Sequence, residues 1–323
     1  EASGNMGNDA NGGTDLTEVN VATTDQSIDT CTNNFATLSP LRYAIHTLAE
    51  GNLQYTAATS AWKGVFSTIG VSTGKWYCEV KYSSLDGSTF RFYTGIADAR
   101  DFNTVHKVGQ NESGRVGDTI GFLPDASSPD VLKNGSDAGG SWSTMSVNDI
   151  LGMAIDCDNG ALYFSKNGTW ENSSDPESGA SKTGAITFTV GETYLFGFGT
   201  YGDSSPQQQV NFGSPIHSIS SGNTDGDGYG NFEYAVPSGY FSINTKNLAE
   251  YGHQSDWVWL KRRDGTAGHR IADSVRGATK LIYSDSNTSE QTDAKSITGF
   301  VSTGFTLGDD ANGYDVNTNT NTM

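Results

Sequence analysis

Hydrophobic and polar residues alternate most clearly between Lys75 and Tyr82. Successive side chains of a β-strand point to opposite faces. One face of the predicted strand therefore carries Trp76, Cys78, Val80 and Tyr82, and the other carries Lys75, Tyr77, Glu79 and Lys81. Burying the first set stabilises the fold by several kcal/mol, at about 25 cal/mol per Å² of apolar surface. We therefore predict a strand with Trp76 in the core.

A second strong pattern, DILGMAIDCDNGALYFSKNGTW, runs from Asp149 to Trp170. The unbroken small and apolar run over 150–155 is typical of a strand that is buried on both faces. Asp158-Asn159-Gly160 supplies residues that take the positive φ angles of a tight turn. The aliphatic and aromatic run over 161–165 then predicts the returning strand, and Asn167-Gly168 predicts a further turn.

Shorter apolar runs predict further strands, and no window carries the sustained 3.6-residue apolar stripe of a long helix. The chain of 323 residues contains 40 Gly, which favours many short strands joined by tight turns. Aromatic residues make up 11% of the chain although the hydrophobic fraction is only 35%. A core of fewer but larger side chains follows, and we predict an all-β protein. The predicted strands cover a pair over 53–69, then 90–97, 117–123, 185–190, 194–199 and 208–212.

Three phrases in this order resemble the SPRY domain, a concanavalin-like antiparallel β-sandwich used for binding partners. They are the core-Trp strand GKWYCEVKY (74–82), the Gly-Asp-led strand GDTIGFLPD (117–125) and the hairpin IDCDNGALYFSKNGTW (155–170). The resemblance implies a sandwich over 48–248 that binds through loops at one end. It implies no particular ligand, because function resides in the loops rather than in the fold.

The flanking segments resemble virion proteins of tailed and marine phages. DTCTNNFATLSP (29–40) is similar to the lead-in that precedes the SPRY region in those proteins, and NFEYAVPSGYFSINTKNL (231–248) to the segment after it. WVWLKRRDG, DSVRGATK and GFVSTGFTLG resemble a small β-rich module that follows. We therefore expect a polar lead-in over 1–47, with one strand near Leu16 to Val21, and a β-rich module over 249–323. In that group a short aromatic strand comes next, so we expect this chain, which stops at Met323, to be a fragment.

The net charge of −18 is concentrated before Thr245, where 11 basic and 27 acidic residues lie, against 8 and 10 from that residue onward. Neither part has the basic footprint that phosphate binding needs, so nucleic acid is not an expected partner. No stretch has the roughly 18 apolar residues of a membrane span. Three cysteines without CxxC spacing predict neither a disulfide framework nor a zinc site.

One candidate metal loop has the spacing of a calcium site. Asn223, Asp225 and Asp227 stand at positions 1, 3 and 5, with Gly228 at position 6, so oxygen ligands could converge on one ion. Tyr234 occupies position 12, where a bidentate Glu is expected, and a flexible Gly/Asp turn explains the same residues. Calcium is therefore the one cofactor that the sequence suggests.

Other polar residues have a structural interpretation. Asp156 and Asp158 flank Cys157 and are expected to accept backbone hydrogen bonds in the hairpin turn. The five Asn-x-Ser/Thr sequons begin at residues that we interpret as turn positions: Asn111, Asn134, Asn167, Asn172 and Asn287.

Loop aromatics are the candidate binding residues. Phe102, Trp142 and Trp170 lie in or beside long polar loops, where their rings could stack on a sugar or anchor a peptide. The SPRY resemblance points to the loops 98–116 and 124–147. The alternative is that Trp142 and Trp170 cap the core. The five histidines are scattered and form no catalytic motif, so no enzyme activity is expected.

These inferences predict a non-enzymatic structural or appendage protein of a virion, such as a fibre or a capsid decoration. Its partners would be other virion proteins or a glycan or protein receptor on the host surface, and a homo-oligomer suits either role. Two alternatives remain open at this point. One is a phage-borne glycoside hydrolase, and the other is a bacterial surface adhesin.

Overall fold

The computed structural model describes eleven stretches of the chain, which divides into two compact units, 1–245 and 246–323. The predicted strand near Leu16 to Val21, Cys31 and the end of the chain after residue 309 lie outside the described residues. Among the described residues no helix is long and apolar enough to cross a membrane. The described stretches are 28–30, 32–41, 46–57, 59–84, 91–124, 128–202, 205–251, 255–261, 266, 268–301 and 304–309.

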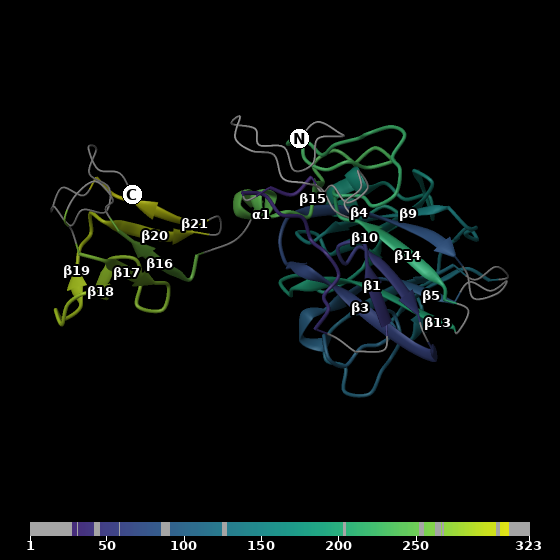
Figure 1. Cartoon of the computed structure of the whole chain (residues 1–323), viewed down its shortest axis with the longest axis horizontal. Helices are drawn as coiled ribbons and strands as arrows, with labels where there is room; N and C mark the ends of the chain where they lie inside the picture. The colour runs from purple at the N-terminus through teal and green to yellow at the C-terminus, as the bar shows by residue number, and fades with distance from the viewer. Residues whose placement is uncertain are drawn as a thin grey trace, which may run out of the picture. The chain divides into compact units, whose positions relative to one another are not determined.

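The first unit contains two β-sheets (Figure 1). The nine-stranded sheet has a main path of seven strands in the order β1 (His46–Ala49), β2 (Gln54–Ala57), β14 (Gln207–Asn211), β4 (Lys75–Ser84), β9 (Ile150–Asp156), β10 (Ala161–Lys166) and β11 (Thr169–Trp170). Beside it, β12 (Ile186–Thr187) pairs with β10, and β15 (Phe241–Ser242) pairs in parallel with β4. The six-stranded sheet runs β3 (Thr59–Val71), β13 (Tyr194–Gly202), β5 (Phe92–Asp98), β6 (Thr119–Leu123), β7 (Asp130–Lys133) and β8 (Ser136–Asp137).

Side chains of the two sheets meet in one buried core. The Tyr82 hydroxyl lies 3.1 Å from Thr94 Oγ1, and Gln208 Nε2 donates a hydrogen bond to Thr94 Oγ1 over 2.7 Å. The rings of Phe122 and Phe164 pack across the sheets with centroids 5.6 Å apart. All strand pairs of the two sheets are antiparallel except that of β15 with β4. The two facing sheets confirm the predicted β-sandwich.

The β9–β10 hairpin of the large sheet has the predicted form. β9 and β10 pair antiparallel from Asp156↔Ala161 to Leu151↔Lys166, and Gly160 takes a φ of 69° in the turn. Every residue of β9 is buried, as its unbroken apolar run indicates. Trp76, on the neighbouring β4, is 1% exposed and donates Nε1 to the carbonyl of Thr73 over 2.7 Å.

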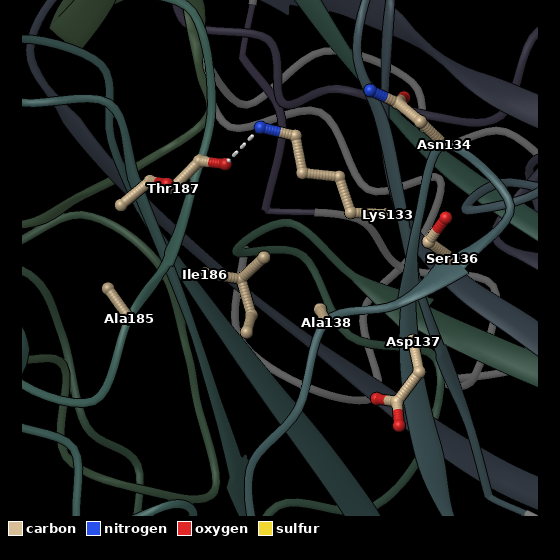
Figure 2. A pocket seen from close by; sticks show the side chains of 8 residues that line it. All are labelled: Lys133, Asn134, Ser136, Asp137, Ala138, Ala185, Ile186 and Thr187. Atoms are coloured by element: carbon tan, nitrogen blue, oxygen red, sulfur yellow. Dashed lines mark hydrogen bonds between the residues drawn. The ribbon is translucent and has the colours of Figure 1, made fainter.

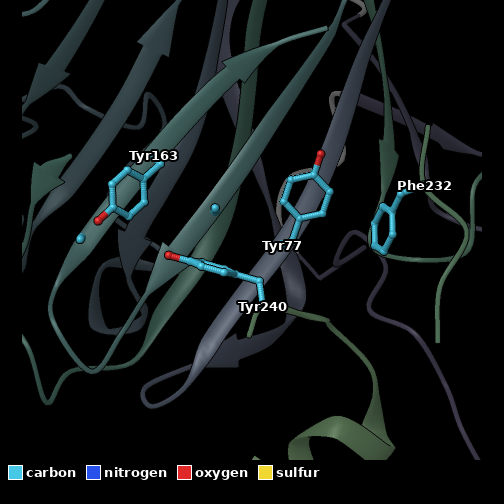
Figure 3. Packing of buried hydrophobic residues seen from close by; sticks show 6 residues of the cluster. Tyr77, Tyr163, Phe232 and Tyr240 are labelled. Atoms are coloured by element: carbon cyan, nitrogen blue, oxygen red, sulfur yellow. The ribbon is translucent and has the colours of Figure 1, made fainter. Parts of the chain in front are cut away.

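The outer face of the large sheet is also covered. Tyr77 and Glu79, on the polar face of β4, are 1% and 0% exposed. Tyr77 belongs to a second apolar cluster that includes Tyr163, Phe232 and Tyr240 (Figure 3). Glu79 accepts hydrogen bonds from the Tyr77 hydroxyl, from Asn211 and from the backbone N–H groups of residues 233 and 234. Burial raises the pKa of Glu79, although these hydrogen bonds oppose the rise.

The described start and the end of the first unit pair with each other. Phe35 and Asn244 form an antiparallel bridge, and Ala36 donates its N–H to the carbonyl of Ile243 over 2.9 Å. Thr245 donates its N–H to the carbonyl of Asn34, and the Asn34 N–H donates to the Thr245 hydroxyl, each over 3.0 Å. Residues 34–36 and the last residues of the first unit therefore meet at one place.

The second unit is smaller and also β-rich. After α1 (Thr245–Tyr251), which begins at the last residue of the first unit, a four-stranded sheet runs β16 (Trp257–Leu260), β17 (Arg270–Asp273), β18 (Lys280–Tyr283) and β19 (Gln291–Thr292). A separate hairpin joins β20 (Ile297–Val301) and β21 (Gly304–Leu307). Their shared core is formed by Val258, Ala272, Leu281 and Ile297.

Candidate ligand pocket at the edges of the two sheets

A pocket of about 330 Å³ lies where an edge of the six-stranded sheet approaches β12 of the nine-stranded sheet (Figure 2). The β7–β8 hairpin forms one wall. The short strand β12, which pairs with β10 through Leu162↔Ile186, forms the other. The lining residues are Lys133, Asn134, Ser136, Asp137, Ala138, Ala185, Ile186 and Thr187.

The hairpin wall is shaped by its turn. Asn134 and Gly135 have φ angles of 55° and 85°, the two positive values that a type I′ turn requires. The Asn134 side chain accepts a hydrogen bond from the Thr119 N–H and donates to Asp118 Oδ1 over 2.8 Å. The turn is therefore fixed to β6 by its own side chain, and that wall of the pocket is preformed.

Lys133 and Asp118 hold the two walls together. Lys133 Nζ donates to the carbonyl of Thr187 over 2.7 Å (Figure 2). It also lies 3.6 Å from Asp118 Oδ2. The same Asp118 oxygen accepts from the N–H and the hydroxyl of Thr189, each over 2.9 Å. Partial burial favours the neutral acid, but the hydrogen bonds from Asn134 and Thr189 and the charge of Lys133 outweigh it and lower the pKa of Asp118.

A pair of acids lies on the hairpin. Partial burial and then the charge and hydrogen bonding of Asp137 raise the pKa of Asp130, against the opposing hydrogen bond from Val131. Asp137 also lines the pocket and is exposed. The rim thus carries an ammonium group on Lys133 and a carboxylate on Asp137, with an amide and hydroxyls between them.

The lining combines an apolar floor with a charged rim. Ile186 is buried, and Ala138 and Ala185 are partly exposed beside it. A small apolar side chain of a ligand fits such a floor. The rim offers hydrogen-bond donors and acceptors to the polar groups of the ligand on either side of that side chain. None of the eight lining residues is aromatic. The chemistry therefore suits a short peptide segment better than a sugar ring, which aromatic faces bind by stacking.

The three aromatic residues singled out in the sequence lie in separate environments, outside the pocket lining. Phe102 packs against Phe66 on the outer side of the six-stranded sheet, with centroids 5.8 Å apart. Trp142 is edge-on to Phe122 and Phe164, at 6.2 and 6.0 Å, and donates Nε1 to the carbonyl of Gly139.

Trp170 packs against the cluster around Tyr77, with ring centroids 6.4 Å apart. The loops that carry the two tryptophans are joined to each other. Ser143 N–H donates to Glu171, and the backbone of residues 141 and 172 is hydrogen-bonded. All three candidate rings are partly exposed, so a role in binding stays a prediction for each of them.

The candidate calcium loop is closed by hydrogen bonds. Asp225 Oδ1 accepts from the N–H groups of Asp227 and Tyr229, and Oδ2 accepts from the N–H and hydroxyl of Ser242. The Asn223 side chain donates to Ser221 and to the carbonyl of Glu233, whereas Asp227 is exposed. Among the described residues no group of three or more His, Cys, Asp or Glu could hold a metal ion. Calcium binding stays a prediction.

The hairpin acids and most sequons have the structural roles that the sequence suggests. Asp156 is buried, forms an ion pair with Lys75 at 3.2 Å and accepts from Asn159, and Asp158 accepts from the N–H of Gly74. Three sequon asparagines take positive φ angles and use their side-chain amides in hydrogen bonds: Asn134, Asn167 and Asn172.

The sequence does not predict the pocket, because the hairpin lies inside the interval 124–147, whose polar composition predicts a loop. A signal was present. The run Val131-Leu132-Lys133 is followed by Asn134-Gly135, the dipeptide most typical of a two-residue hairpin turn. The other wall lies within the predicted strand 185–190, but no local pattern indicates that the two segments meet.

Comparisons with known proteins concern both units. A family described as "Domain of unknown function (DUF7483)" matches residues 233–323. No curated protein matches the chain. Among solved structures, the SPRY domain of human HERC1 is similar at 12% identity and a TM-score of 0.40, covering 54% of this chain and 96% of that one.

Two further solved structures are also SPRY domains. The TRIM65 PSpry domain has 14% identity and a TM-score of 0.40, covering 55% of this chain and 92% of that one. A human SPRY domain has 11% identity and a TM-score of 0.36, covering 55% and 98%. These similarities are too low to indicate what this chain binds.

Proposed function

We propose that the chain is a non-enzymatic binding protein of a virion, and that its sandwich binds an extended peptide segment of a neighbouring virion subunit. The observation that carries the proposal is the pocket between the β7–β8 hairpin and β12. It has two walls from different sheets, an apolar floor at Ile186 and Ala138, and opposite charges on its rim.

The geometry supports a peptide ligand for a physical reason. The β7–β8 hairpin and β12 leave an opening between the two sheets that Lys133 crosses with one hydrogen bond. An extended segment lying in this opening would place one small apolar side chain on Ile186 and would find Lys133 and Asp137 on either side. Because the turn and Lys133 are already held by hydrogen bonds, little conformational entropy is lost on binding.

The assignment to a virion rests on the resemblance of segments 29–40 and 231–248 to phage virion proteins. The acidic balance of the first unit supports a protein that avoids nucleic acid and works outside the cell. In this proposal the chain forms a symmetric homo-oligomer, as fibres and capsid decorations do. A glycan or protein receptor on the host surface is the alternative partner, and Trp142 and Trp170 are the rings that would contact a glycan.

A peptide selection tests the pocket directly. Peptides selected from a displayed random library on the full chain are synthesised with a fluorescent label and titrated against variants. Ala138→Trp fills the floor and is expected to weaken binding roughly a hundredfold. Ser218→Trp, which adds the same side chain at an exposed loop position, is the matched control and is expected to bind normally. Equal binding to both variants would reject the pocket as the site.

Two further measurements separate the alternatives. A panel of host polysaccharides is incubated with the chain and analysed by size. A fall in polymer size means glycoside hydrolysis, and retention without cleavage means glycan binding. The proposal expects neither result.

A further inference from the structure

An exposed aromatic surface on the second unit is the feature that the pocket does not explain. Trp257 and Trp259 are 55% and 52% exposed, and they are the only aromatic residues among the exposed large hydrophobic side chains of the described residues. They alternate along β16 and therefore share one face of the sheet, while Val258 between them is buried in the core.

The two rings are held in place. Their centroids are 5.7 Å apart in an edge-to-face arrangement. Trp259 also donates Nε1 to His269 Nδ1 over 2.9 Å and packs against that ring at 5.4 Å. The surface is therefore preorganised, and a partner that covers it loses little side-chain entropy from these residues.

The strand that carries the rings is an edge strand. Within the described part of the chain β16 pairs with β17 alone, through Trp257↔Asp273 to Leu260↔Arg270. The opposite edge of the same sheet, β19, is only two polar residues long. The four residues Trp-Val-Trp-Leu contain neither a charge nor a proline, two of the features by which soluble proteins protect an edge from pairing.

We propose that β16 pairs antiparallel with β16 of a second copy of this chain, so that two four-stranded sheets become one sheet of eight strands. The proposal rests on the symmetric oligomer proposed above and names the surface that forms it. Opposite residues of paired strands share a face, so a two-fold axis perpendicular to the sheet keeps all four tryptophans on one side.

Charge complementarity favours this occupant and this direction. Asp256 precedes the strand and Lys261 follows it, so antiparallel pairing brings the acidic end of one copy to the basic end of the other, whereas parallel pairing would align like charges. With Trp259 opposite its counterpart, Trp257 faces Lys261 of the second copy, a cation–π pair. The second unit is also near neutral, with 8 basic and 10 acidic residues from Thr245 onward. Two copies can therefore meet at this unit with less charge repulsion than at the strongly acidic sandwich.

Sedimentation of the full chain at roughly 1 to 100 µM, the range in which small interfaces associate, tests the pairing. The wild-type chain is expected to form dimers. The double variant Trp257→Lys, Trp259→Lys is expected to raise the dissociation constant at least about a hundredfold. Val275→Lys, at a position 95% exposed on the same unit but outside β16, is the matched control and should dimerise normally. Monomers of the wild-type chain, or dimers of the double variant, would overturn the proposal.

Disulfide trapping tests the register. A mixture of Trp257→Cys and Lys261→Cys chains is expected to form a mixed disulfide between the two, because directly opposite residues lie within disulfide reach. Each variant alone should give only the amount of disulfide-linked dimer that the three native cysteines produce in the wild-type chain. A second copy at another surface would leave the mixture uncrosslinked. The pocket proposal stays separable, because the monomeric β16 variant should still bind the selected peptide and Ala138→Trp should still dimerise.

Discussion

Lys133 Nζ donates a hydrogen bond to the carbonyl of Thr187 over 2.7 Å, and this contact joins the β7–β8 hairpin to β12 across the opening of the sandwich. The bond is partly exposed, so it adds little to global stability, but it sets the width of the proposed pocket. It is therefore a place where binding and stability can be separated by one substitution.

Lys133→Met keeps the length of the side chain and removes the donor. We expect a loss of less than about 1 kcal/mol in the free energy of unfolding, because water reaches the Thr187 carbonyl. Hydrogen exchange over residues 185–189 should rise, and affinity for the selected peptide should fall by roughly three- to tenfold. Lys166→Met is the matched control, because Lys166 makes the same kind of bond to the carbonyl of Thr144 away from the pocket. Equal effects of both variants on peptide affinity would contradict the role of Lys133.

Trp76→Ala tests the core. Trp76 is 1% exposed, and its removal leaves a large cavity between the sheets. We expect the free energy of unfolding to fall by about 3–5 kcal/mol. Chemical denaturation monitored by circular dichroism measures this loss. A neutral result would mean that the two sheets do not depend on the ring that the alternating pattern places between them.

His217 predicts a dependence of stability on acidity. Neither ring nitrogen has a hydrogen-bond partner among the described residues, and burial, together with the charge of Lys81, lowers the pKa of His217 to about 4 against the opposing charge of Glu233. In the unfolded chain this histidine binds its proton at about pH 6.5. As the pH falls from 6.5 to 4, protonation therefore increasingly favours the unfolded state over the folded state. The part of the folding free energy that depends on neutral His217 is therefore fully present above pH 6.5. It is lost progressively as the pH falls from 6.5 to 4.

His217→Leu removes this titration. We expect the variant to lose about 1–3 kcal/mol less than the wild-type chain between pH 7.5 and pH 4, a range that discounts the full shift because the ring is partly exposed. Urea unfolding at both pH values, compared between the two proteins, cancels the common titration of the carboxylates. An equal loss of unfolding free energy in the two proteins between pH 7.5 and pH 4 would show that His217 does not contribute to the pH dependence.

Asp225 separates a structural carboxylate from a calcium ligand. Asp225→Ala removes the acceptor of four hydrogen bonds and is expected to cost about 2–4 kcal/mol in buffer containing EDTA. Asp227→Ala, at an exposed position of the same loop, should cost under about 0.5 kcal/mol.

Calcium titration of the wild-type chain then decides the metal prediction. A rise in melting temperature that Asp227→Ala abolishes would support a calcium site that forms by rearrangement of the loop. No heat of binding and no thermal shift would remove calcium from the description of this protein.

Local sequence patterns predict the strands of the sandwich better than they predict what covers them. The alternation around Trp76 and the turn at Gly160 are short-range signals, and both are present in the structure. The alternating pattern puts Tyr77 and Glu79 on the polar face of β4, yet both are buried because a segment more than 150 residues later packs over them. Such a long-range contact leaves no periodicity in either segment.

The candidate site shows the same division. Asn134-Gly135 is a local signal that could have located the hairpin wall of the pocket. The opposite wall is joined to it by Lys133 and Asp118, residues separated from Thr187 and Thr189 by more than 50 positions. The three aromatic residues that the sequence suggests for binding are conspicuous, but each packs in a separate cluster. Large rings bury much apolar surface, so packing against neighbouring rings stabilises the fold.

The pairing of Phe35 with Asn244, and of Asn34 with Thr245, has a mechanical consequence for a protein that bears load. Tension applied between residues 34 and 245 acts on these few hydrogen bonds before it reaches either sheet. The two sheets, and the proposed pocket at their edges, carry none of that force until this short junction ruptures.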